Sequence, residues 1–327
     1  MRRRQRVWAN VAAITITALV AGGAIDVEAR QKGMYSASAR ATSATTGAIT
    51  TLAGTRSSQL EANGAATLSP VQASLRDVSL LAVAVDAQVA SSGASVGITL
   101  DELGGTDPID WSFNGDEVFT AASTYKLAAL MLEAENIASG KTDPNGMVCF
   151  QSDDYESGWF DDYAAGACYS RNVLAVRAGI YSDNTAGHML VRDVGGADAL
   201  NAWAASVGAT NSQFFVANTT TASDLAALWA AEAEGELGGA AAQAWLYPML
   251  TGTRTEGGVP AGVSGTTVVH KTGTIDLVDN DAALVNSGPD GAYVLVVMTD
   301  GLGGSAGWQV IAGISTTVWE FEAARSP

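Results

Sequence analysis

The sequence predicts an α+β fold, in which an antiparallel sheet of about five strands, flanked by helices, is built from both ends of the folded region. Strand-like segments gather near residues 95–113 and 266–299, and helical patterns fill the interval between them. The roughly 258 residues from Pro70 onward are enough to bury a sizeable core. Strands at both ends with helices between them favour an inserted all-α subdomain.

The individual elements follow from local patterns. Apolar residues at helical spacing predict helices at 70–89 and 307–324, and helices throughout 123–250. Runs of β-branched and apolar residues predict strands at 95–100, 109–113, 266–271, 282–285 and 292–299, the first two joined by a Gly-Gly turn.

We therefore expect one domain over residues 70–327. It consists of an α/β part, 70–120 together with 256–327, and a mainly α part, 121–255.

The first 69 residues are not expected to join this domain. Four arginines in the first six residues, followed by an apolar run, predict a secretory signal over residues 1–29, with an uncleaved single-span anchor as the alternative. Residues 30–69 are rich in Ser, Thr, Ala and Gly, which predicts a flexible linker. The protein is expected to be exported, whether secreted, periplasmic or held on the cell-wall side of the membrane.

Three short motifs occur in one order: Ser123-Thr124-Tyr125-Lys126, Ser182-Asp183-Asn184 and Lys271-Thr272-Gly273-Thr274. A helix that starts near Ser123 would bring Lys126 to the Ser123 hydroxyl, because residues three apart share a helix face. Serine becomes a good nucleophile when a base takes its proton. Lysine can be that base once burial and a neighbouring cation, here Lys271, lower its pKa. The motifs thus predict acylation of a serine without a catalytic histidine.

The motifs and their flanks resemble those of the penicillin-recognising serine enzymes, the group that includes class A β-lactamases and D,D-peptidases. Phe119-Thr120-Ala121-Ala122 leads into the first motif, and Val259-Pro260-Ala261-Gly262 lies upstream of the third, where the family has a similar turn. The resemblance extends from about Pro70 to the C-terminus. It implies the β-lactamase/D,D-peptidase-like fold, with the active site between the α/β part and the α part.

The resemblance also implies a role for each motif residue. The catalytic residues would be Ser123, Lys126, Ser182 and Lys271. The backbone N–H groups of Ser123 and Thr274 would form the oxyanion hole. The substrate-binding residues would be Asn184, Thr272, Gly273 and Thr274. Gly273 would leave room for the substrate backbone, whereas Asp183 would anchor its own loop.

One segment departs from class A β-lactamases, in which a loop glutamate between the second and third motifs activates the hydrolytic water. The corresponding segment, 206–221, is about fifteen residues short by comparison and contains no Glu or Asp. We therefore expect slow release of a β-lactam from Ser123. Glu156 could replace the missing base, but its acidic surroundings favour a solvated loop. Glu232, Glu234 and Glu236 also indicate a solvated face.

Cys149 and Cys168 are the only cysteines, and in an exported chain they predict one disulfide that pins the loop before the second motif. Neither cofactor nor metal is expected, because no metal-ligand spacing is present. His188 lies on a predicted helix, where we expect it to be structural. His270 falls on the strand face opposite Lys271, so we expect no catalytic role for it. Arg254 could either reach the cleft or stay on the surface.

The formal net charge of −17 argues against nucleic acid and anionic lipid as partners. Two lysines in a cleft of this acidic body would still attract a small carboxylate. We expect a monomer that acts on a small molecule or a peptide. Two functions remain open: a hydrolase of β-lactams, D-alanyl peptide ends or small esters and amides, and a penicillin-binding sensor that is acylated and stops.

Overall fold

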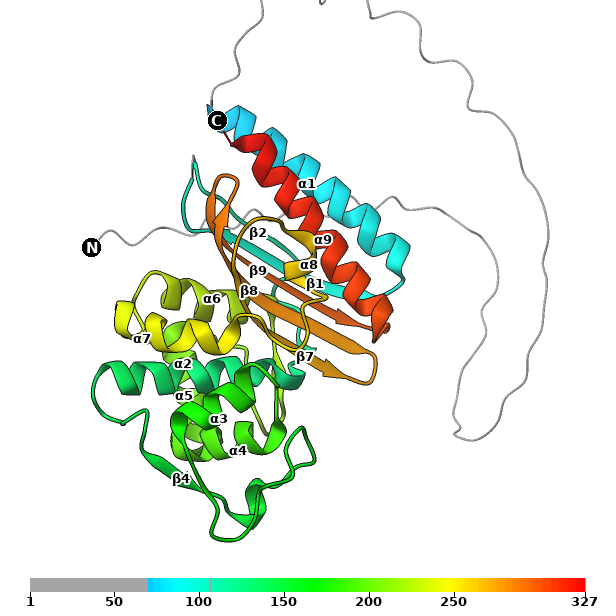
Figure 1. Cartoon of the computed structure of the whole chain (residues 1–327). Coiled ribbons are helices and arrows are strands. Elements are labelled where there is room, and N and C mark those ends of the chain that lie inside the picture. The colour runs from blue at the N-terminus through cyan, green and yellow to red at the C-terminus, as the bar shows by residue number, and fades with distance from the viewer. Residues whose placement is uncertain (1–69, 106, 327) are drawn as a thin grey trace, which may run out of the picture. The chain divides into compact units, whose positions relative to one another are not determined.

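A five-stranded antiparallel sheet, with strand order β2-β1-β9-β8-β7, lies at the centre of the computed structural model, which describes residues 70–105 and 107–326 (Figure 1). Its strands are β1 (Ser95–Glu102), β2 (Asp110–Phe113), β7 (Val268–Ile275), β8 (Val278–Gly288) and β9 (Gly291–Asp300). The α+β class and the five strands are as predicted. Since β1 pairs with β9, residues from both ends of the domain share one sheet.

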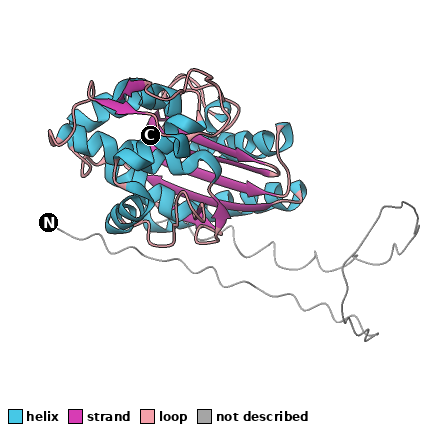
Figure 2. Ribbon diagram, turned by 90° about the horizontal axis from the view of Figure 1, so that it is seen from below, coloured by secondary structure: helices cyan, strands magenta, loops and turns pink. Residues whose placement is uncertain are grey.

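Both faces of the sheet are buried around its inner strand β9, whose residues from Tyr293 to Met298 are all apolar and buried. On β9, Leu295 and Val297 pack with Ile314 in one core, whereas Val294 and Val296 belong to the other. The first core is closed by α1 (Pro70–Ser92) and α9 (Ser305–Arg325), which lie side by side in Figure 1. Figure 2 shows the strands lying side by side, with helices on both sides of them.

The other face carries the helical insertion. It comprises α2 (Tyr125–Ala138), α3 (Arg171–Gly179), α4 (Asn184–Asp193), α5 (Gly196–Val207), α6 (Ala222–Ala233) and α7 (Gly239–Leu246). Helix α6 packs on the sheet, and α2 packs against α3, α4, α5 and α7. Most of α2 is buried, which explains its nearly continuous apolar sequence. The short α8 (Val259–Gly262) packs against α9.

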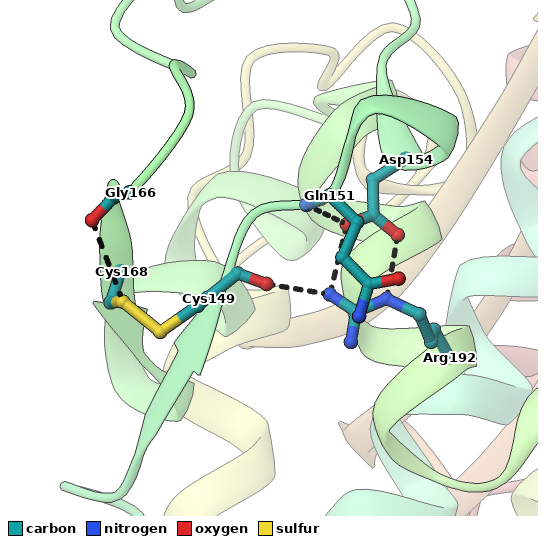
Figure 3. Close-up of a disulfide and its surroundings, with 6 residues drawn as sticks. All are labelled: Cys149, Gln151, Asp154, Gly166, Cys168 and Arg192. Carbon is teal, nitrogen blue, oxygen red and sulfur yellow. Dashed lines mark hydrogen bonds and ion pairs between the residues drawn. A yellow bond between two sulfur atoms is a disulfide. The ribbon is translucent and has the colours of Figure 1, made fainter.

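Two small ribbons were not predicted, because strands of two or three residues show no alternation. Strand β3 (Phe119–Thr120) pairs with β6 (Thr219–Thr220), and β4 (Met147–Cys149) pairs with β5 (Cys168–Ser170). Cys149 and Cys168 face each other across the second ribbon and form the predicted disulfide (Figure 3). The ribbon and its disulfide therefore hold the two ends of the loop 150–167 together.

The structure corrects one predicted boundary near the first motif. Ser123 lies in a 3₁₀ turn, Ala122–Thr124, and the α-helix begins only at Tyr125. The predicted leader (1–29) and linker (30–69) lie outside the described residues. Within the part that is described, no helix is long and apolar enough to cross a membrane.

Candidate active site

The three motifs meet at one place in the fold. The Lys126 Nζ, from the first turn of α2, donates to the Ser123 Oγ at 3.0 Å. Ser123 follows Ala122, whose φ of 47° is a left-handed value that is strained for a side-chain-bearing residue. We expected an α-helix starting near Ser123 to bring its hydroxyl to Lys126. The 3₁₀ turn before α2 brings the two side chains together instead.

Lys126 is fully buried and surrounded by oxygen atoms. Its Nζ also lies 2.7 Å from the Asn184 Oδ1, 2.7 Å from the Ser182 carbonyl oxygen and 3.5 Å from the Ser182 Oγ. Burial lowers the pKa of Lys126 to about 7, against the opposing charges of Asp183 and Glu156. A substantial share of Lys126 is therefore uncharged near neutral pH and able to accept a proton.

Lys271 approaches the same serine of the second motif from β7. Its Nζ donates to the Ser182 Oγ at 2.9 Å and to the Thr272 carbonyl oxygen at 2.7 Å. Burial and the nearby Lys126 charge hold the pKa of Lys271 well below its usual range. The charge of Lys126 thus lowers the pKa of Lys271, as expected of two neighbouring cations. The lowered pKa of Lys126 itself is due mainly to burial.

The second motif is held in place by Asp183. Its carboxylate accepts from the backbone N–H of Ala186, which caps α4, and from the Tyr163 hydroxyl and the Trp159 backbone N–H at 2.7 and 2.9 Å. Asp183 therefore anchors its loop, as expected. Ser182 just before it has a φ of 57°, another left-handed value that these contacts maintain.

Gly273 lies close to the turn that carries Ser123. The absence of a side chain at Gly273 matters for a reason that differs from the expected one. A Cβ at this position would stand 2.6 Å from the Ala121 carbonyl oxygen and 3.0 Å from the Ser123 nitrogen. The room is thus needed by the chain's own backbone rather than only by a substrate. The next residue, Thr274, donates its hydroxyl to the Asp279 carboxylate at 2.9 Å.

A cavity of about 240 Å³ opens beside Ser123. The residues that line it are Ser123, Trp159, Gly179, Ile180, Tyr181, Ser182, Asn184, Thr253, Arg254, Thr255, Thr272 and Thr274. Five of the predicted site residues are among them. Arg254 reaches this cavity, and its guanidinium lies 5.2 Å from the centre of the Trp159 ring. The sequence did not decide whether Arg254 reaches the cleft or stays on the surface. It also did not indicate that Trp159 and Tyr181 would line the cavity.

Two predictions about charged residues have different outcomes. His270 is buried away from the cavity, with Nδ1 2.9 Å from Asp281 and Nε2 3.2 Å from Glu256, which agrees with its assignment to the opposite strand face. The prediction that Glu232 is solvated is wrong. Glu232 is 1% exposed and accepts from the Tyr247 hydroxyl at 2.8 Å, and burial raises its pKa to about 7.

Glu156 is half exposed but does not extend freely into solvent. Its Oε1 accepts from the Asn184 Nδ2 at 2.8 Å, and its Oε2 lies 3.0 Å from the His188 Nε2. Asn184 and His188 are four residues apart on one helix and so share a face, but the sequence did not indicate that Glu156 would lie against that face. In the residues that the structure describes, no group of three or more His, Cys, Asp or Glu side chains is arranged to hold a metal ion.

Similarity to known proteins shows the family and the fold of this chain. The model of the β-lactamase enzyme family (Beta-lactamase2) matches residues 80–321. A comparison with curated proteins finds no match.

Among solved structures, the chain is similar to PBP-A, with 25% identity and a TM-score of 0.69 over 74% of this chain and 95% of PBP-A. A PBP-A mutant described as an acyl-enzyme complex with penicillin G matches at the same identity and TM-score, over 74% of this chain and 96% of the mutant. A β-lactamase from Sphaerobacter thermophilus also matches, with 25% identity and a TM-score of 0.67, over 76% of this chain and 99% of that one. The chain belongs to the β-lactamase enzyme family.

Proposed function

We propose that this protein is an exported active-site-serine hydrolase, acylated at Ser123 by β-lactams or by D-alanyl peptide amides, with Lys126 as the base. The observation that carries this proposal is the 3.0 Å contact between the Lys126 Nζ and the Ser123 Oγ. Lys126 is buried there, with a pKa lowered to about 7. A nucleophile in hydrogen-bond contact with a base of near-neutral pKa suits acyl transfer at physiological pH.

The acylation step follows from these contacts. Ser123 Oγ attacks the substrate carbonyl carbon while its proton passes to Lys126, and the backbone N–H groups of Ser123 and Thr274 bind the resulting oxyanion. Ser182 then protonates the leaving nitrogen as the C–N bond breaks. Its hydroxyl lies between Lys126 and Lys271, so a proton can be resupplied from either side. The product is an ester on Ser123.

The cavity also suits a substrate that carries a carboxylate. Burial and the Lys126 charge lower the pKa of Lys271, and an arriving carboxylate would favour its protonated form. Arg254 adds a permanent positive charge to the cavity wall, and Thr272 and Thr274 add hydroxyl groups. Asn184 would hydrogen-bond the substrate amide. β-Lactams and peptide C-termini both combine a reactive amide with a carboxylate.

A D,D-peptidase or a penicillin-binding sensor that deacylates slowly is the second candidate. The observation that favours it is the segment 206–221, which contains no Glu or Asp to activate water. Export, in either case, is supported by the arginine-rich leader and its apolar run.

The nucleophile can be tested by incubating the full chain with a fluorescent penicillin and following covalent labelling on a denaturing gel. Ser123→Ala should abolish labelling. Ser206→Ala, which changes an exposed serine on α5, should label at the wild-type rate. Undiminished labelling of Ser123→Ala would show that another residue is acylated.

A further inference from the structure

Release of an acyl group from Ser123 requires a base that activates water, and the structure narrows the choice of that base. Carboxylates are suited to this task when water can reach them. Asp183 is fully buried and already accepts hydrogen bonds from the Tyr163 hydroxyl and from backbone N–H groups. Glu156, by contrast, is about half exposed and contacts a residue of the second motif.

The side-chain amide of Asn184 contacts both Glu156 and Lys126. Asn184 donates from Nδ2 to the Glu156 Oε1 at 2.8 Å and accepts at Oδ1 from the Lys126 Nζ at 2.7 Å. The negative charge of Glu156 acts on Lys126, whose pKa it raises against the larger effect of burial. The carboxylate thus lies close to the group that contacts the Ser123 hydroxyl.

His188 fixes the other oxygen of this carboxylate. The His188 Nδ1 lies 3.1 Å from the Asp154 carbonyl oxygen, which can only accept, so Nδ1 carries a hydrogen. The Nε2 faces the Glu156 Oε2 at 3.0 Å and donates to it when the ring carries its second proton. The ring also packs edge-on against Phe215, with centroids 5.0 Å apart, so it has little freedom to turn. Glu156 is therefore held from two sides on an otherwise acidic, exposed loop.

We propose that Glu156 is the general base that deacylates Ser123, in place of the carboxylate that the segment 206–221 lacks. This inference rests on the proposed function. Glu156 takes a proton from a water molecule, and the water oxygen bonds to the acyl carbon. The C–Oγ bond of the ester then breaks, and the proton passes to the Ser123 oxygen. The free serine and a carboxylic acid are the products.

A purely positioning role would leave a different signature. If Glu156 only oriented Asn184, its loss would disturb Lys126 and slow the formation of the acyl-enzyme. If Glu156 is the base for water, its loss leaves formation intact and prolongs the lifetime of the adduct. Glu156→Gln separates the two roles, because glutamine can still accept from Asn184 but cannot take up a proton.

The test is time-resolved intact mass spectrometry of the full chain after rapid mixing with benzylpenicillin, for the wild type, Glu156→Gln and Glu156→Ala. Asp161→Asn removes the same charge from an exposed residue of the same loop and is the matched control. We expect Glu156→Gln to acylate at the wild-type rate and to hold the adduct about 10²–10⁴ times longer. Asp161→Asn should behave as the wild type does, and thermal unfolding should confirm that each variant is folded.

Two results would overturn the inference while leaving the proposed function intact. One is a wild-type adduct that already lasts as long as that of Glu156→Gln. The other is a Glu156→Gln variant that acylates slowly but releases its acyl group at the wild-type rate, as a positioning role requires. Absence of any adduct and of penicillin consumption in the wild type would instead refute acylation itself, and the inference with it.

Discussion

At the scale of single residues, the site places two buried amino groups on either side of the Ser182 hydroxyl. Burial of a charged group is costly unless it is paired, and no carboxylate contacts the Nζ of Lys126 or of Lys271 within the described residues. The structure therefore favours the uncharged form of at least one lysine. The sequence indicated which residues would meet, but the degree of burial depends on chain segments far from the motifs.

The lowered pKa of Lys126 predicts how acylation depends on pH. The rate of acylation should rise as Lys126 loses its proton and should level off above a midpoint near pH 7. Stopped-flow labelling of the full chain between pH 5 and pH 9 measures this profile. Lys126→Arg keeps the positive charge throughout this range, so its rate should fall by about 10²–10⁴-fold. A wild-type rate that does not change over this range would argue against Lys126 as the base.

The close approach at Gly273 predicts the effect of adding one methyl group. Gly273→Ala should destabilise the protein by about 1–3 kcal/mol, because its Cβ would stand 2.6 Å from the Ala121 carbonyl oxygen. It should also slow labelling, because the displaced turn carries Ser123. Urea denaturation measures the first effect. Gly104→Ala, whose nearest neighbour would be at 3.8 Å, is the control and should change neither quantity.

At the scale of elements, the loop 150–167 has more structure than its acidic sequence suggests. The β4–β5 ribbon and the disulfide join its ends, and the Arg192 guanidinium bonds both the Cys149 carbonyl oxygen and the Asp154 carboxylate (Figure 3). The same loop supplies Trp159 to the cavity and Glu156 to Asn184. The disulfide could be predicted from the cysteine count, whereas the contacts of Glu156 depend on how the loop folds back onto α4.

This arrangement predicts that the disulfide affects the cavity as well as stability. Replacing both cysteines by serine should lower the free energy of unfolding by about 3 kcal/mol, by the loop-closure estimate. It should also weaken substrate binding, because Trp159 becomes less firmly held. Urea denaturation and the concentration dependence of labelling measure the two effects. A reducing agent should act on the wild type in the same way and should leave the double variant unchanged.

The His270 cluster predicts a stability effect with a defined dependence on pH. Burial alone would lower the pKa of His270, but Asp281 and Glu256 outweigh it and raise the pKa to about 9. Because the folded pKa exceeds the unfolded value of 6.5, this stabilisation is complete below pH 6.5 and is lost as the pH rises through 9.

His270→Asn should therefore cost about 3 kcal/mol near pH 6, where it leaves Asp281 buried without its cation, and progressively less towards pH 9.5. Urea denaturation at several pH values tests this. An equal difference between variant and wild type at every pH would mean that the ion pairs with His270 do not contribute to stability.

At the scale of the whole molecule, the residues of the candidate active site meet because both ends of the domain form one sheet. Lys271 on β7 meets Ser182, which lies 89 positions earlier and just before α4. The sequence predicted the α+β class and the five strands, since long apolar runs mark buried strands. It did not predict the short ribbons or the place of Glu232, because these depend on tertiary contacts rather than on local pattern.

The most direct test of the account is to locate the acylated residue. The full chain is mixed with excess benzylpenicillin, quenched with acid at intervals from milliseconds to minutes, and analysed by intact mass and then by peptide mapping. The account predicts one equivalent of covalent adduct, on the peptide that contains Ser123. An adduct on another residue, or neither an adduct nor any consumption of penicillin, would contradict it.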